Sequence, residues 1–198
     1  MKNKTNQKAS PQALKICAMT ILCLAVMLGI SAVKKGQAQE QLAQEYTVDE
    51  GSPRHIKFEV MPEDEAQRTV GLFFKYQGMG QYTDCRELVA ADQAASMNFE
   101  QQEADFKDGA YIREYIIHSF TTLSESEYED PKEHYQGLAV LHDYEEYRII
   151  RVSFSQKWTD KALEKAPQWG DGDYTRDFAV GKEKGRKGKW KIFELGMM

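Results

Sequence analysis

The sequence predicts an α+β fold in which helices pack on one face of an antiparallel sheet of about four strands. Two stretches with apolar residues at helical spacing come first in the domain, before a weak short element. From residue 111 onwards, segments rich in β-branched and aromatic residues follow one another to the C-terminus. Helices and strands that are segregated along a chain in this way are typical of α+β domains.

An uncharged apolar stretch, Ile16–Val33, precedes this domain and predicts where it is located. As a helix it would extend roughly 27 Å, close to the ~30 Å hydrocarbon core of a bilayer. Residues 1–15 contain four lysines and no acidic residue. Such a basic flank is typical of a secretory signal and also of an anchor whose N-terminus stays in the cytoplasm. We therefore expect the C-terminal part of the chain to lie outside the cytoplasm.

Two alternatives remain open for the apolar segment. Gly36 and Ala38 place small residues where a signal peptidase requires them, so that cleavage near Ala38 would secrete the domain. Lys34 and Lys35 argue against cleavage. The length of the apolar run does so too, because the apolar core of a signal peptide usually has about 7–15 residues. The favoured expectation is a single-pass protein of the cell membrane with its C-terminal domain outside.

The chain is thus expected to comprise a cytoplasmic basic tail (1–15), an anchor or signal segment (16–33), a linker (34–61) and an exported α+β domain (62–198). Without its first 38 residues the chain has 20 basic and 31 acidic residues, a net charge of −11. An acidic surface repels nucleic acid and anionic headgroups, so we expect no nucleic-acid partner.

The first helix of the domain is expected from Glu63 to Gln77. Three acidic residues would lie in its first turn, where they interact favourably with the helix dipole, and Gly78 and Gly80 would end it. In the linker before it, alternation near Ile56 indicates a short first strand.

A second, shorter helix is expected from Tyr82 to Ala91. It carries Cys85 on its apolar face, where a buried structural thiol is favoured over a reactive one. Residues 92–110 are polar and fit a short helix or an ordered loop.

The strands begin with Tyr111–Leu123. The acidic segment Ser124–His134 reads as an exposed loop, and Tyr135–Tyr144 is predicted to be a strand broken by Gly137.

Tyr147–Trp158 alternates clearly, with Ile150, Val152, Phe154 and Trp158 on one side. A long connection with a small helix at Lys161–Ala166 would lead to Tyr174–Gly181, which pairs with Lys189–Leu195 in an antiparallel hairpin.

This order of elements resembles the cone-shaped α+β fold of the ketosteroid isomerase and nuclear transport factor superfamily. The resemblance rests on the helices Glu63–Gln77 and Tyr82–Ala91 and on Gly188–Ile192, where a glycine turn precedes a Trp-Lys-Ile strand. It covers about residues 60–198. More narrowly, the chain is similar to uncharacterised exported members of that superfamily in Gram-positive bacteria. The resemblance implies a curved sheet whose concave face lines a pocket.

Three residues are candidate ligand-binding groups, because they lie on elements that would line such a cone: Tyr82, Tyr115 and His118. His118 is in phase with Ile112, Ile116 and Phe120 along its predicted strand, which predicts that it faces the same side as these apolar residues.

No stretch of the sequence has the spacing of a known catalytic or metal motif. His142-Asp143 lacks a further ligand at suitable spacing, so we expect no metal site and no cofactor.

The leading hypothesis is a non-catalytic extracytoplasmic module that binds a small molecule or an envelope protein, with a homodimer left open. The alternative is a small isomerase, dehydratase or hydrolase in which His118 and a nearby Asp or Tyr supply acid and base. A third hypothesis is a tethered subunit whose basic turn, Lys182–Lys191, contacts an anionic polymer or lipid.

Overall fold

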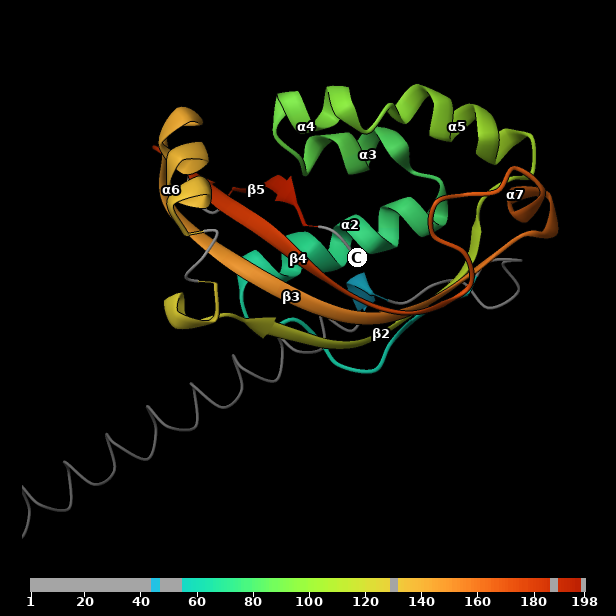
Figure 1. The fold of residues 1–198 in the computed structure, drawn as a ribbon, viewed down its shortest axis with the longest axis horizontal. Helices are drawn as coiled ribbons and strands as arrows, with labels where there is room; N and C mark the ends of the chain where they lie inside the picture. Colours follow the sequence, from blue (N-terminus) through green and yellow to red (C-terminus); the bar gives the residue numbers. More distant parts are fainter. Residues whose placement is uncertain (1–43, 47–54, 129–131, 186–188, 197–198) are drawn as a thin grey trace, which may run out of the picture. The chain divides into compact units, whose positions relative to one another are not determined.

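The computed structural model describes residues 44–46, 55–128, 132–185 and 189–196. Residues from Tyr46 onwards belong to one compact unit, which has the α+β architecture predicted from the sequence (Figure 1). Over these described ranges its sheet has five strands in the order β1-β2-β3-β4-β5. In Figure 1 the long strands β3 and β4 are visibly bent.

Strand β1 (His55–Phe58) makes the sheet mixed, which corrects the prediction of an antiparallel sheet of about four strands. It pairs in parallel with β2 (Ile112–Thr122). Four helices connect these two strands, so the chain returns to the end from which β1 started, as a parallel pair requires.

The strands of the antiparallel part were predicted close to their observed positions, except for the strand expected at Tyr135–Tyr144. Strands β3 (Tyr144–Trp158), β4 (Gly172–Glu183) and β5 (Trp190–Leu195) follow β2 in order. The small helix α7 (Asp160–Glu164) lies in the connection between β3 and β4, close to its predicted position.

Helix α2 (Glu65–Met79) covers one face of the sheet and confirms the first predicted helix to within two residues. The Asp64 side chain caps its N-terminus by accepting a hydrogen bond from the Gln67 amide at 2.9 Å. Gly80 ends the helix with a left-handed φ of 70°, and a Cβ there would collide with the Phe106 ring. The main core lies between α2 and the sheet.

The second predicted helix is shorter than expected. Helix α3 runs only over Tyr82–Glu87, because the backbone of residues 88–90 pairs with β5 instead. The Ile192 amide donates to the Leu88 carbonyl, and the Ala90 amide donates to the Ile192 carbonyl, each at 2.8 Å. Two further helices follow, α4 (Ala91–Ser96) and α5 (Phe99–Lys107), where a short helix or loop was expected.

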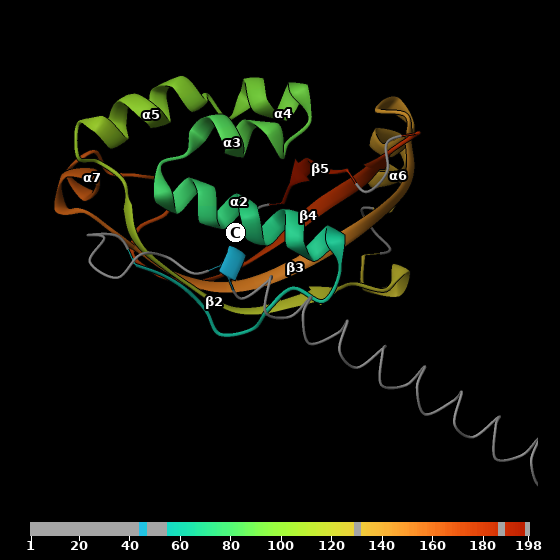
Figure 2. The same ribbon diagram turned by 180° about the vertical axis from the view of Figure 1, so that it is seen from behind.

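The prediction of a strand at Tyr135–Tyr144 is wrong, because helix α6 (Lys132–Leu141) occupies most of that segment. Tyr135 and Ala139 lie four residues apart on one helical face and are buried. They join a second core on the sheet face opposite α2, with Ile149 and Phe193. Figures 1 and 2 show α6 and α7 at opposite ends of the sheet.

The acidic loop Ser124–His134 is only partly confirmed. It contains the 3-10 helix η1 (Glu125–Glu127), its residue Tyr128 is buried in the second core, and its last residues belong to α6.

In the part of the chain that the structure describes, no helix is both long and apolar enough to cross a bilayer. The segment Ile16–Val33 and the cleavage site near Ala38 lie outside the described residues, so both remain predictions.

Candidate functional site

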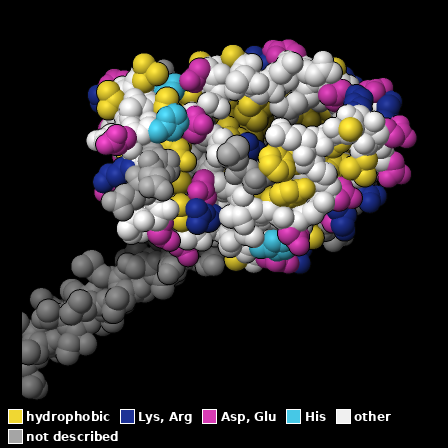
Figure 3. All heavy atoms as spheres, viewed as in Figure 1, with side chains coloured by type: hydrophobic (Ala, Val, Ile, Leu, Met, Phe, Trp, Pro, Cys, Tyr) yellow, Lys and Arg dark blue, Asp and Glu magenta, His cyan; other side chains and the backbone are white. Residues whose placement is uncertain are grey.

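A cavity of about 300 Å³ lies between the helices and the inner face of the sheet, the face that α2 covers. Side chains of α2, α3, α5, β2, β3 and β4 line it, together with the segment before β2 and the loop after α7. Figure 3 shows hydrophobic side chains in hollows beside the layer formed by α4 and α5. The lining residues are Phe73, Phe74, Gln77, Tyr82, Gln102, Asp105, Ala110, Tyr111, Ile112, Tyr115, Phe154, Gln156, Trp158, Trp169, Arg176 and Phe178.

Aromatic rings form the apolar part of the wall. Phe74 lies at their centre, with ring centroids 5.3 Å from Tyr115, 4.9 Å from Phe154 and 5.5 Å from Phe178. The contacts with Tyr115 and Phe178 are edge-to-face, a favourable geometry for aromatic pairs. The rings therefore hold one another in place and give the cavity a defined shape.

A chain of hydrogen bonds forms a polar strip along the same wall. The Tyr115 hydroxyl donates to Gln77 Oε1 at 3.1 Å, and Gln77 Nε2 donates to Gln102 Oε1 at 3.4 Å. Gln102 Nε2 then donates to the Met97 carbonyl at 2.6 Å. These hydrogen bonds join β2, α2 and α5 and fix the orientation of the Gln77 and Gln102 amides. Burial raises the pKa of Tyr115 far above its usual value, so this residue is a neutral donor.

Two other polar groups of the wall have unused hydrogen-bonding capacity. Gln156 is only 2% exposed, and its Nε2 donates to the Gly170 carbonyl at 2.9 Å. Its Oε1 has no partner among the described residues. The indole Nε1 of Trp158 is buried and likewise has no partner there. Unpaired buried polar atoms are rare and need an explanation.

Arg176 brings a positive charge to the inner face of β4. Its Nε donates to the Gly196 carbonyl at 2.7 Å, and its guanidinium lies 5.9 Å from the centroid of the Phe178 ring. Within the described part of the chain, no carboxylate forms an ion pair with it. Burial lowers the pKa of Arg176, and the nearby Tyr115 opposes this shift. An arginine nevertheless stays charged at neutral pH.

Asp105 supplies the carboxylate of the lining. It accepts hydrogen bonds from Lys165 Nζ at 2.6 Å and from Gln101 Nε2 at 3.1 Å. The bond from Lys165 holds the pKa of Asp105 below its usual value. Asp105 is therefore ionised and already neutralised by a lysine.

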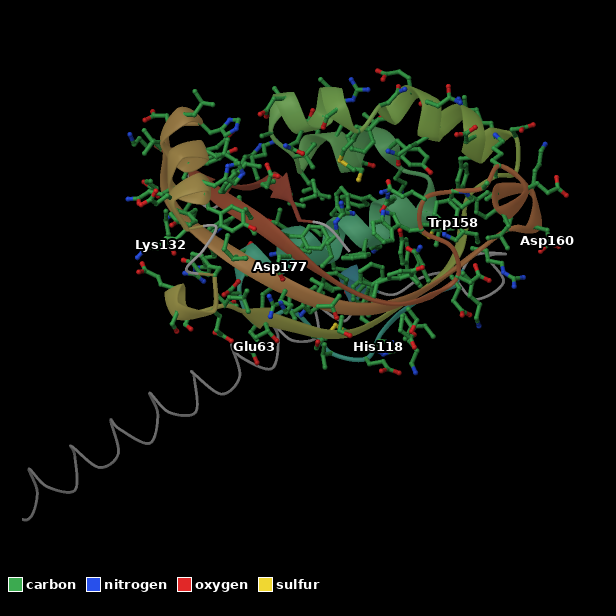
Figure 4. All side chains as sticks on the ribbon, in the orientation of Figure 1. Glu63, His118, Lys132, Trp158, Asp160 and Asp177 are labelled. Atoms are coloured by element: carbon green, nitrogen blue, oxygen red, sulfur yellow. The ribbon has the colours of Figure 1, made fainter. Side chains whose placement is uncertain are left out.

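The structure places two of the three predicted site residues in the cavity. Tyr82 and Tyr115 line it, whereas His118 lies on the outer face of the sheet. Figure 4 shows Trp158 on the side of the helices and His118 at the opposite side of the sheet.

The prediction that His118 faces the same side as Ile112 and Phe120 is wrong. Strand β2 has register shifts between Ile112 and Glu114 and between Ile117 and Ser119. Each such bulge adds a residue and reverses the alternation of side chains. Ile112 and Phe120 pack against the main core, while the strand between them presents Tyr115 and Ile117 to that core.

His118 takes part in a chain of hydrogen bonds across the outer face. Its Nδ1 is 2.8 Å from Glu59 Oε2, and its Nε2 is 2.7 Å from Ser155 Oγ. This spacing resembles a carboxylate–histidine–serine triad. Ser155 Oγ, however, donates its proton to Asp173 Oδ1 at 2.5 Å, so this proton is not directed at Nε2 of His118 as a catalytic triad requires. These hydrogen bonds therefore link Glu59, which follows β1, with β2, β3 and β4 rather than activating a nucleophile.

Sequence reasoning missed Arg176 and Gln156, although a signal was present for both. Arg176 alternates in phase with Phe178 and Val180, and Gln156 lies between Phe154 and Trp158 on the apolar side of its strand. A polar or charged residue in phase with an apolar face is buried, and a buried polar group requires a partner.

Other reactive or metal-binding groups do not add to the site. Cys85 is fully buried, with its pKa raised chiefly by burial, which confirms the structural thiol. Over the described ranges, no group of three or more His, Cys, Asp or Glu side chains is placed to hold a metal ion.

Comparisons of the chain with models of protein families, with curated proteins and with solved structures found no match. The candidate site therefore stands on the geometry of this chain alone.

Proposed function

We propose that the α+β domain is a non-catalytic module that binds a small, largely apolar molecule in the cavity between α2, α5 and the inner face of the sheet. The observation that carries this proposal is the combination of a preformed aromatic wall with polar groups whose hydrogen-bonding capacity is unfilled. Ligand pockets characteristically pair an apolar lining with a few polar groups that orient the ligand.

The protonation states of the lining residues favour binding over catalysis. General acid–base catalysis needs a group whose pKa lies near the working pH. Tyr115 is held neutral by burial, Asp105 is held ionised by Lys165, and Arg176 stays charged. In the lining, as far as the chain is described, there is no histidine.

A location outside the cytoplasm and a kinship with the ketosteroid isomerase and nuclear transport factor superfamily complete the proposal. Ile16–Val33 would tether the module to the cell membrane, or cleavage near Ala38 would release it. Both rest on the sequence, as does an envelope protein or a second copy of the chain as partner. The bent sheet with helices on its inner face is compatible with this kinship.

The second candidate function is a hydrolase that uses Ser155, His118 and Glu59 on the outer face. The two short contacts of His118 favour it, whereas the hydrogen bond from Ser155 to Asp173 opposes it. A fluorophosphonate probe distinguishes the two functions. We expect no labelling of Ser155, and labelling that disappears in His118→Ala would establish the hydrolase.

Intrinsic fluorescence tests the binding function, because two of the three tryptophans, Trp158 and Trp169, line the cavity. The purified full-length chain, kept free of detergent in lipid nanodiscs, is titrated with 2-phenylethanol, phenethylamine and phenylacetate. We expect at least one of these to change the tryptophan emission in a saturable way.

Two matched variants locate the binding. Ala110 lines the cavity and Ala95 is exposed on α4. Ala110→Phe fills the cavity and should weaken binding by at least about tenfold, whereas Ala95→Phe should leave it unchanged. Equal affinities of the two variants, or no saturable change with any compound, would contradict the proposed function.

A further inference from the structure

We propose that the ligand of this cavity is a small carboxylate, and that the guanidinium of Arg176 binds its carboxylate group. This inference rests on the proposed function, because it names the chemical class of the molecule that the cavity takes. Four features of the cavity lead to it.

The first feature is the state of Arg176 itself. A charge that is largely removed from water is costly unless a counter-charge and hydrogen bonds accompany it. Arg176 has one hydrogen bond, from Nε to the Gly196 carbonyl, and the described residues offer it no carboxylate. The lowered pKa reports this loss of solvation. An anionic ligand would supply the missing counter-charge.

The second feature is the geometry of the N–H donors of Arg176 that do not contact Gly196. The Gly196 carbonyl holds the Nε edge of the guanidinium, and the two Nη atoms have no partner among the described residues. A planar fork with free N–H groups binds the two oxygens of a carboxylate or phosphate. Packing beside Phe178 restrains the guanidinium, so less freedom is lost on binding.

The third feature is the charge of the rest of the lining. Asp105 would repel an anion, but Lys165 neutralises it at 2.6 Å. Tyr115 is a neutral hydroxyl, and the other polar side chains of the wall include the amides of Gln77 and Gln156. Among the described residues that line the cavity, Arg176 therefore carries the one uncompensated charge, which is positive.

The fourth feature is size. At ~30 Å³ per water molecule, the cavity corresponds to roughly ten waters. A phenyl ring with a short carboxylate arm matches that volume, and its ring would contact Phe74 and Phe154. A monocarboxylate of this size fits better than a phosphate ester, because the described lining residues offer no second unpaired cation for the second charge of a phosphate.

The test compares phenylacetate with phenylacetamide, which has the same shape without the charge. Their dissociation constants are measured by tryptophan fluorescence on the full-length chain. We expect phenylacetate to bind at least about tenfold more tightly, because a hydrogen-bonded charge pair in a partly desolvated site is strong.

Arg176→Gln should remove this preference, so that the acid and the amide bind equally. Arg113→Gln is the matched control, since Arg113 is exposed on β2 and does not line the cavity. It makes the same change in net charge and should keep the full preference. The melting temperature of each variant is measured alongside, and Arg176→Lys tests the loss of the planar fork with the charge retained.

The outcomes separate the two proposals. Equal binding of acid and amide to the unsubstituted chain would overturn the carboxylate inference and leave the binding function standing. A preference for the acid that survives Arg176→Gln in a folded variant would also overturn it. Binding of 2-phenylethanol or phenethylamine without binding of phenylacetate would overturn the inference alone. Failure of all these compounds to bind would overturn the binding function and, with it, the inference.

Discussion

Two arginines on neighbouring strands lie on opposite faces of the sheet and differ in whether a carboxylate pairs with them. On the outer face, Arg151 of β3 lies opposite Asp177 of β4 and donates to both of its carboxylate oxygens, at 2.8 and 2.9 Å. On the inner face, Arg176 precedes Asp177 in sequence but has a backbone carbonyl as its hydrogen-bond partner and no described carboxylate. Arg151 therefore has its counter-charge within the fold. Arg176 has no carboxylate partner among the described residues, and in our proposal the ligand supplies one.

The same contrast extends to the other polar groups of the two faces. Outside, Lys157 pairs with Glu114 at 2.7 Å, and His118 is held on both sides by Glu59 and Ser155. Inside, Gln156 and Trp158 have unused hydrogen-bonding atoms. Paired polar groups on an open face stabilise the sheet, while unpaired ones inside a cavity indicate a ligand.

The largest expected effect concerns the aromatic wall. Phe74→Ala removes a 2% exposed ring that packs on four other rings, and such substitutions cost about 3–5 kcal/mol of unfolding free energy. Denaturant unfolding measures the loss. A loss below about 1 kcal/mol would mean that the wall is loosely packed and the cavity is not preformed.

The next effect concerns the hydrogen-bond chain of the inner wall. Gln77→Leu leaves the buried Tyr115 hydroxyl without its acceptor and should cost about 1–3 kcal/mol. Adding Tyr115→Phe removes the stranded hydroxyl, so the double variant should recover part of that loss. Strictly additive losses in the double-mutant cycle would show that the two side chains are not coupled.

A smaller effect of opposite sign is expected at Arg176. Arg176→Met replaces a half-buried charge, which has no ion-pair partner among the described residues, with an apolar chain of similar reach. It should raise the unfolding free energy by about 1 kcal/mol in the absence of ligand. The same variant should lose its preference for phenylacetate. A large destabilisation instead would assign Arg176 a structural role through Gly196.

The smallest effect concerns the hydrogen bonds of the outer face that join Glu59 to His118. The hydrogen bond from His118, followed by that from Lys57, lowers the pKa of Glu59 from 4.5 in the folded protein. Its contribution to stability is therefore complete above pH 4.5 and is lost as the pH falls through the folded pKa. The melting temperature of Glu59→Gln should lie below that of the unsubstituted chain at pH 6 and converge with it in acid. A difference that is constant with pH would show that ionised Glu59 is not involved.

Local patterns in the sequence were sufficient for much of the fold. The alternation of Ile150, Val152 and Phe154 defines β3 because a strand with one buried face leaves this period in its own residues. Helix α6 escaped prediction because its buried face packs on a second core formed with distant residues such as Phe193. Helix α3 is shorter than predicted for a similar reason, because the backbone around Val89 pairs with β5.

The candidate site was predictable only in part. Tyr82 and Tyr115 were found because the elements that carry them were placed correctly. His118 was misplaced because two bulges reverse the phase of β2, and bulges depend on the pairing with β3 rather than on local sequence. Arg176 was visible in the pattern as a charge in phase with core residues.

The most direct measurement is a crystal structure of the protein with 4-bromophenylacetate, using the anomalous signal of bromine. We expect a bromine peak in the cavity near the rings of Phe74 and Phe154, with the carboxylate oxygens about 2.7–2.9 Å from the guanidinium of Arg176. Peaks confined to the outer surface at saturating ligand, or a cavity ligand that leaves Arg176 without a carboxylate contact, would contradict this expectation.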